Sequence, residues 1–134
     1  MAQLIRRNTM VARARIQNLE RLAQRIEDEQ IPGDVVECGV YKGGTAAILA
    51  RQATHSKLPR TVWLVDTFQG MPAATEADGP GAASWVGSLT SSPKRVERLL
   101  RRTGADLSGV RIGTRNVPGD ISENTDKADR ALEY

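Results

Sequence analysis

The stretch from Asp34 to Thr45, which reads Asp-Val-Val-Glu-Cys-Gly-Val-Tyr-Lys-Gly-Gly-Thr, constrains the fold of this chain most. Two β-branched valines follow the breaker pair Pro32-Gly33, which predicts a short buried strand over 35–38. Three glycines then allow a sharp turn and the close approach of a ligand; they are Gly39, Gly43 and Gly44. Thr45 is placed to cap a following helix. This order of strand, glycine-rich turn and helix is typical of the cofactor corner of an α/β sheet.

The flanking segments predict the helices and strands that complete such a sheet. Apolar residues recur at three- and four-residue spacing over about 9–29, which predicts an N-terminal helix within 8–30 that packs on the sheet, with Asn8 or Thr9 as its cap. A helix over about 45–52 leads to a second strand over 61–65, whose continuous apolar character is typical of a strand covered on both faces. Because a helix-length segment joins the two strands, we expect them to be parallel.

The second half of the chain is less regular. Residues 67–91 show no periodicity and are rich in Gly, Pro, Ala and Ser, which is typical of a lid-like loop. Ser92-Pro93 predicts the start of a helix that ends near Gly104, and a third strand follows over 110–112. After Gly113 the pattern fails, so residues 113–134 are interpreted as a divergent tail with a weak helix over 127–134. We therefore predict one partial domain over residues 1–134.

Composition narrows the classes of function. The net charge is +3, but no aromatic residues interleave with the basic ones, so we expect no nucleic-acid partner. No apolar run is long enough to span a bilayer and no secretory signal is recognisable, so we expect a cytoplasmic protein. Cys38 is the only cysteine, and we interpret it as a core residue of its strand. Trp63 is also expected in the core, whereas His55 is expected at the surface.

Three cofactor classes compete for the glycine turn. A phosphate-binding P-loop requires lysine where Thr45 stands, and a dinucleotide fingerprint requires glycine where Tyr41 stands. S-adenosylmethionine has no phosphate and needs neither residue. Glu37 and Asp66 end neighbouring strands at one sheet edge, where ligands of open α/β sheets bind. Asp66 is placed to accept hydrogen bonds from a ribose, and Glu37 suits a cationic ligand better than a phosphate.

The sequences Glu37-Cys-Gly-Val-Tyr-Lys-Gly-Gly44 and Trp63-Leu-Val-Asp-Thr-Phe-Gln-Gly70 resemble the macrocin O-methyltransferase (TylF/MycF-type) family of class I methyltransferases. The resemblance covers about residues 8–112 and implies methyl transfer from S-adenosylmethionine to a hydroxyl of a small molecule, typically a sugar of a macrolide-like product, often with Mg²⁺. The cofactor-binding residues that it implies, with those the strand ends suggest, are Glu37, Cys38, Gly39, Val40, Gly43, Gly44, Thr45, Asp66, Thr67 and Phe68.

The resemblance stops after the third strand. The family continues into a further half-sheet with acidic residues for metal and substrate, and nothing after Gly113 matches it. We therefore assign neither catalytic residues nor metal ligands, and we expect a Rossmann-like fold that is truncated after three strands. The alternative is a fragment without activity that binds S-adenosylmethionine, or that pairs with a further copy or with a partner chain along its open sheet edge.

Overall fold

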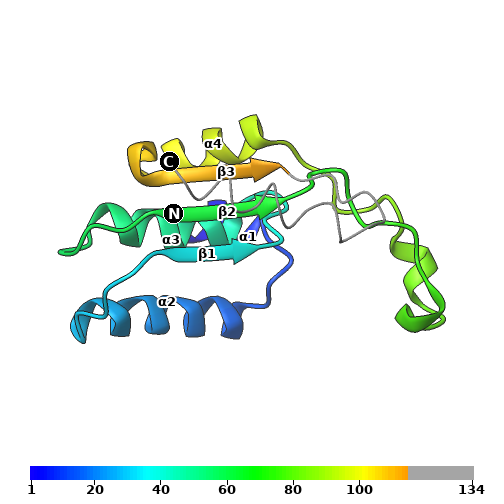
Figure 1. Cartoon of the computed structure of the whole chain (residues 1–134), viewed down its shortest axis with the longest axis horizontal. Coiled ribbons are helices and arrows are strands. Elements are labelled where there is room, and N and C mark those ends of the chain that lie inside the picture. The colour runs from blue at the N-terminus through cyan, green and yellow to red at the C-terminus, as the bar shows by residue number, and fades with distance from the viewer. Residues whose placement is uncertain (115–134) are drawn as a thin grey trace, which may run out of the picture.

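The sheet consists of three parallel strands in the order β1-β2-β3 (Figure 1). The structure is a computed structural model, which describes residues 1–114. The strands are β1 (Val35–Cys38), β2 (Val62–Asp66) and β3 (Val110–Thr114). This confirms the predicted parallel α/β sheet. The helix predicted over 127–134 and the divergent tail beyond 114 lie outside the described residues.

Four α-helices accompany the strands in the described part of the chain: α1 (Ala2–Arg6), α2 (Arg13–Asp28), α3 (Gly44–Thr54) and α4 (Pro93–Arg102). Three short 3₁₀ helices, η1 (Glu76–Asp78), η2 (Ala82–Trp85) and η3 (Leu107–Gly109), lie in the connections. None of the helices between residues 1 and 114 combines the length and apolar character that a bilayer crossing requires.

The N-terminal helix predicted within 8–30 begins later than expected, since α2 starts at Arg13, and a separate short helix, α1, lies before residue 8. The Asn8 side chain donates back to the Leu4 carbonyl and so closes α1. Thr9 Oγ1 accepts from the Val11 amide, which forms a turn and not a cap, and α2 follows Ala12 without a side-chain cap. The two expected capping residues therefore serve the connection between α1 and α2.

Helix α4 begins and ends as the sequence predicts. The Ser92 hydroxyl accepts from the Arg95 amide at 3.3 Å, and Pro93 occupies the first helical position. Val96, Leu99 and Leu100 are buried against the sheet, and Gly104 follows the last turn with a φ of +82°.

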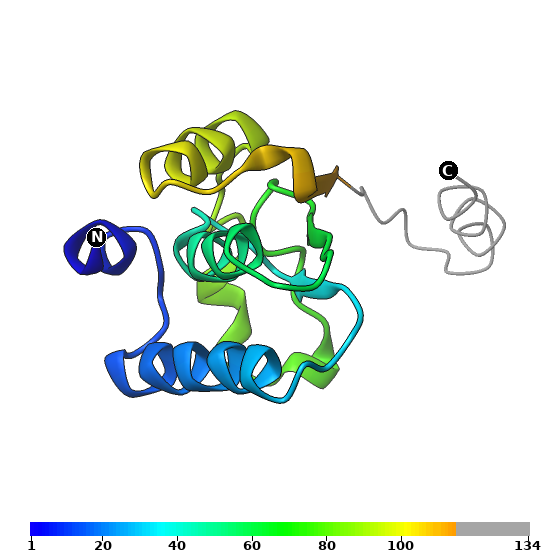
Figure 2. The same cartoon turned by 90° about the vertical axis from the view of Figure 1, so that its left-hand side faces the viewer.

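Only one face of the sheet is covered by the helices of residues 1–114, which Figure 2 shows gathered on one side of the strands. Val62 and Leu64 of β2 are fully buried on that side, among small residues of α3. On the other face Val36 is 62% exposed, and Cys38 is exposed as well. The predictions of a β2 covered on both faces and of Cys38 in the core are therefore wrong for the described chain. Trp63 is only partly buried, and its indole N–H donates to Asp34.

A buried arginine joins α2 to the sheet. Arg60 precedes β2, and its side chain is only 3% exposed. Its guanidinium donates to Glu27 near the end of α2 at 2.7 Å, and to the carbonyls of Ile31 and Gly33 at 2.6 and 2.8 Å. These bonds fix the C-terminal end of α2 beside β1.

Candidate functional site

The carboxylate of Asp66 holds the glycine turn against the end of β2. Its Oδ2 atom accepts hydrogen bonds from the amides of Val40 and Tyr41, both at 2.7 Å. Its Oδ1 atom accepts from the amide of Phe68 at 2.8 Å. Because these bonds are charge-assisted, they fix the loop after β1 and the loop after β2 relative to each other.

A cavity of about 430 Å³ opens at this junction, at the carboxyl edge of the sheet. The only charged side chain in its lining is the Asp66 carboxylate, and the lining contains no lysine or arginine. The lining residues are Gly39, Tyr41, Val65, Asp66, Thr67, Gly70, Met71 and Leu89. Its size suits a small organic molecule, and its place is the usual ligand site of an open α/β sheet.

Backbone strain is concentrated around this cavity. Tyr41, Phe68 and Leu89 have backbone φ values of +52°, +58° and +60°, which residues other than glycine rarely adopt. Tyr41 and Leu89 line the cavity, and Phe68 follows the lining residue Thr67. Such strain is commonly held at binding sites by the surrounding structure, here at Tyr41 and Phe68 by the Asp66 hydrogen bonds.

The second predicted carboxylate, Glu37, lies beneath the turn and does not line the cavity. Its Oε1 atom accepts a hydrogen bond from the Thr45 hydroxyl, whereas its Oε2 atom is buried without a partner. Thr45 was predicted to cap the helix, but Gly43 occupies the cap position and the Thr45 hydroxyl is directed to Glu37. Burial raises the pKa of Glu37 to about 7; the Thr45 hydrogen bond opposes this, and the charge of Asp66 adds to it.

The three glycines of the turn have different roles. A side chain at Gly39 would meet no atom within 4 Å, and this residue lines the cavity. At Gly44 a Cβ atom would lie 2.7 Å from the backbone oxygen of Asn8, and at Gly43 it would lie 2.9 Å from Val96. Gly39 is thus the one of the three that borders the ligand space, whereas Gly43 and Gly44 permit close packing of α4 and α1.

The structure divides the ten predicted cofactor residues into two groups. Gly39, Asp66 and Thr67 line the cavity. The other seven do not line it; they are Glu37, Cys38, Val40, Gly43, Gly44, Thr45 and Phe68. Sequence reasoning did not assign Tyr41, Val65, Gly70, Met71 or Leu89, which also line it. Gly70 carried a usable signal, since a glycine in the loop after a strand often marks a close approach of the backbone to another group. A Cβ atom there would lie 2.4 Å from the Ser88 carbonyl oxygen.

The segment 67–91 is more ordered than its composition predicts. The Met71 amide donates to the Ser88 carbonyl and the Gly87 amide donates to the Met71 carbonyl, each at 2.9 Å, and these bonds close the base of the segment beside the cavity. Beyond this base the chain forms an exposed arm that contains η1 and η2 (Figure 1). Trp85, at the end of η2, is 49% exposed.

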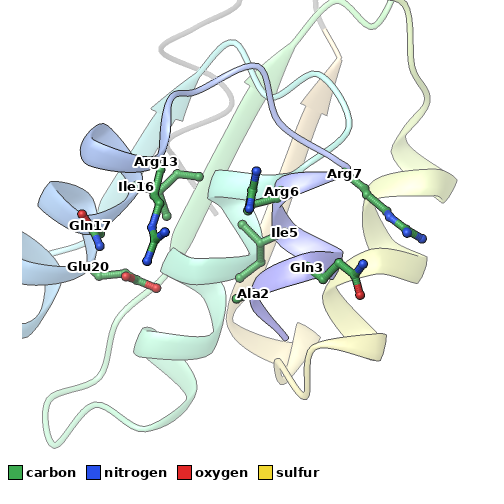
Figure 3. Close-up of a pocket in the computed structure, with 9 residues that line it drawn as sticks. All are labelled: Ala2, Gln3, Ile5, Arg6, Arg7, Arg13, Ile16, Gln17 and Glu20. Atoms are coloured by element: carbon green, nitrogen blue, oxygen red, sulfur yellow. The ribbon is translucent and has the colours of Figure 1, made fainter.

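A larger cavity of about 800 Å³ lies between α1 and α2 and shares no lining residue with the Gly39 cavity. Figure 3 shows Arg6 of α1 beside Arg13 and Glu20 of α2, whereas Arg7 points away toward α4. None of the predicted cofactor residues lies there. Within residues 1–114, no three His, Cys, Asp or Glu side chains gather where they could hold a metal ion.

The sequence of this chain is similar to the sequences of known O-methyltransferases. Mycinamicin III 3''-O-methyltransferase of Micromonospora griseorubida is 40% identical over 75 residues, which cover 54% of this chain and 29% of that protein. Demethyldecarbamoylnovobiocin O-methyltransferase of Streptomyces niveus is 39% identical over 71 residues, which cover 52% of this chain and 27% of that protein. The matched stretches thus span less than a third of these relatives.

Solved structures extend the similarity over most of the chain. The O-methyltransferase NovP superposes with a TM-score of 0.64 and 28% identity, covering 80% of this chain and 47% of its own. The calicheamicin methyltransferase CalS11 shares the fold, with a TM-score of 0.60 at 20% identity. The model of the macrocin-O-methyltransferase (TylF) family matches residues 6–115. This chain therefore belongs to the macrocin O-methyltransferase (TylF) family.

Proposed function

We propose that this chain binds S-adenosylmethionine in the Gly39 cavity and forms the cofactor-binding half of an O-methyltransferase domain. The observation that carries the proposal is the charge of the lining, which holds the Asp66 carboxylate and no lysine or arginine. A phosphate-bearing cofactor would be repelled there, whereas a sulfonium cation carrying a ribose would be attracted. The family supports the same assignment.

The lining residues suggest how the ligand would lie. Asp66 already accepts three backbone hydrogen bonds, so of about four acceptor sites on a carboxylate one remains for a ribose hydroxyl. Val65, Met71 and Leu89 offer apolar surface suited to a purine ring. Gly39 lets the ligand approach the backbone because no side chain stands between them. Glu37, buried nearby with a free oxygen, favours a positively charged methionine end.

The proposed reaction is methyl transfer to a hydroxyl oxygen. S-adenosylmethionine supplies an electrophilic methyl group when bound, and residues of this chain would fix its position. The relatives' names include a sugar-bearing tetracenomycin substrate, so we propose a glycosylated small molecule as the acceptor. We propose no step through Mg²⁺, since the described residues offer no cluster that fits it. The lone cysteine agrees with a cytoplasmic setting.

Isothermal titration of this chain with S-adenosylmethionine tests the proposal. Val65→Trp would fill the cavity from the uncovered face of β2, where no core packing is disturbed, and should abolish binding. Val36→Trp places the same side chain on the same face outside the cavity, and should leave the Kd unchanged. No heat of binding by the parent chain, or equal affinity of the two variants, would contradict the proposal.

A further inference from the structure

We propose that the groove between α4 and the end of α1 binds a ligand with two linked phosphate groups, either free or as the diphosphate of a nucleotide. This α1–α4 groove shares no lining residue with the Gly39 cavity, so the proposal does not depend on the function proposed above. Three observations support it: the charge of the groove lining, the arrangement of charges along α4, and a further arginine at the end of α1.

The α1–α4 groove is lined by arginines and by no carboxylate. Its volume is about 280 Å³, and its lining residues are Asn8, Arg95, Arg98, Leu99 and Arg102. The three arginines are exposed, and neither of the two ion pairs within residues 1–114 involves them. Guanidinium groups that share one hollow without an acidic partner suit an anion, and arginine forms paired hydrogen bonds with phosphate oxygens.

The charges of α4 are arranged against the stability of the helix. Five of its residues are basic and one is acidic, whereas the whole chain has a net charge of +3. Lys94 and Arg102 each lie four residues from Arg98, and like charges at this spacing destabilise a helix. Lys94 and Arg95 also lie in the first turn, where the helix dipole disfavours a cation. An anion bound beside Arg98 would relieve this repulsion.

Helix α2 shows how a solvent-facing helix of this chain is otherwise charged. It contains four basic and three acidic residues, and Arg25 forms an ion pair with Glu29 at 2.6 Å. Solubility alone therefore requires no excess of one sign in this chain. Local choices that reduce stability, as in α4, are expected at functional sites.

The end of α1 brings a further cation toward the groove. Arg7 directly follows α1, and Figure 3 shows its side chain directed toward α4. The next residue, Asn8, lines the groove and is fixed in place, because its side chain donates to the Leu4 carbonyl at 2.9 Å. Positive charge thus reaches the groove from two separate elements.

The spacing of the arginines indicates an extended anion. Arg95 and Arg102 lie seven residues apart, which is about 10 Å along the helix, and Arg98 lies between them. Two linked phosphates offer oxygens to all three side chains, whereas one phosphate is matched by two. The volume of about 280 Å³ suits a compact charged group. No aromatic side chain lines the groove, so it offers no surface on which nucleic-acid bases would stack.

Isothermal titration of the full chain with pyrophosphate, at about 0.15 M ionic strength, tests the proposal. We expect one saturable site with a Kd below about 1 mM. Arg98→Gln should raise this Kd by about tenfold or more, because the central guanidinium is lost. Arg101→Gln is the matched control, since it removes the same charge from the same helix outside the groove; it should change the Kd by about twofold or less.

Two further titrations identify the chemistry of the ligand. Citrate carries carboxylates in place of phosphates and should bind about tenfold more weakly or worse. Binding of ADP that Arg98→Gln weakens would assign the groove to an esterified diphosphate, whereas binding of pyrophosphate without ADP would assign it to the free anion; either result supports the proposal.

Urea unfolding without any anion separates binding from a structural role. Arg98→Gln should be at least as stable as the parent, because two like-charged pairs are removed. No saturable binding of pyrophosphate, equal losses in the two variants, equal affinity for citrate, or a destabilised Arg98→Gln would overturn the proposal. Failure of S-adenosylmethionine to bind would contradict the proposed function and leave this groove unaffected.

Discussion

Two acidic residues at neighbouring strand ends have different surroundings and therefore different tasks. Asp66 is satisfied by three backbone amides and joins two loops. Glu37 has one hydroxyl partner and one buried oxygen without any. At the scale of single residues, Asp66 should contribute stability as a charged group, whereas the charge of Glu37 should reduce stability until a cation binds nearby.

The pKa of Glu37 predicts a loss of stability as the pH rises. The pKa is about 7 in the folded chain against a reference value of 4.5, so folding favours the protonated form. The associated stability is complete below about pH 4.5 and is lost as the pH rises through 7, by about 3 kcal/mol in total. Glu37→Gln should therefore be more stable than the parent at pH 8 and similar to it near pH 4.5.

Urea unfolding of both proteins at these two pH values measures the difference. Glu76→Gln, on the exposed arm, is the control and should match the parent throughout. A constant difference between Glu37→Gln and the parent across the pH range would contradict the explanation from burial.

Asp66→Asn should loosen the loops that form the cavity. The amide nitrogen cannot accept from the Val40, Tyr41 or Phe68 amides, so at least one of these bonds is lost, at a cost of about 2 kcal/mol. Chemical denaturation measures this cost. Asp106→Asn is the matched control, because Asp106 caps only η3 and is exposed; this substitution should cost clearly less than Asp66→Asn. Equal costs for the two variants would argue against a special role of Asp66.

At the scale of elements, the start of α3 depends on its contact with α1. The Gly44 amide donates to the Asn8 carbonyl at 2.9 Å, and a Cβ atom at Gly44 would lie 2.8 Å from the Ile5 carbonyl oxygen. Backbone atoms on both sides leave no room for adjustment without moving α1. The close approach of α1 therefore explains Gly44 better than a ligand does.

Gly44→Ala should displace α1 and cost about 1–3 kcal/mol, the usual range for overpacking. Amide hydrogen exchange should then become faster over residues 2–8, while β1 and β2 keep their protection. Gly81→Ala is the control, since a Cβ atom there meets nothing within 4 Å. Unchanged exchange in α1 would show that the contact can relax without cost.

At the scale of the whole molecule, local patterns predicted the strands and α4 well. The valines of β1, the apolar run of β2 and the Ser92-Pro93 start of α4 each carry their signal within a few neighbouring residues. Helix α1 and the later start of α2 were missed, because the placement of residues 2–8 depends in part on a contact distant in sequence, in which the Asn8 carbonyl accepts from the Gly44 amide.

The site was predictable only in part, for a similar reason. The strand ends marked Asp66 and Gly39, but two of the three partners of Asp66, Val40 and Tyr41, lie 26 and 25 residues away in sequence. Met71 and Leu89 reach the cavity because the base of the arm closes near it, which composition does not reveal. The exposure of Cys38 depends on what covers the second face of the sheet. The apolar sequence of a strand does not by itself show whether that face is covered or open.

The location of the bound cofactor tests the central claim most directly. Backbone amide chemical shifts of the isotope-labelled chain, recorded as S-adenosylmethionine is added, report which residues sense the ligand. The account predicts saturable shifts concentrated at Gly39, Tyr41, Thr67 and Gly70, with little change in the α1–α2 cavity around Arg6 and Arg13. Shifts centred on that arginine-lined cavity, or no saturable shifts at all, would contradict it.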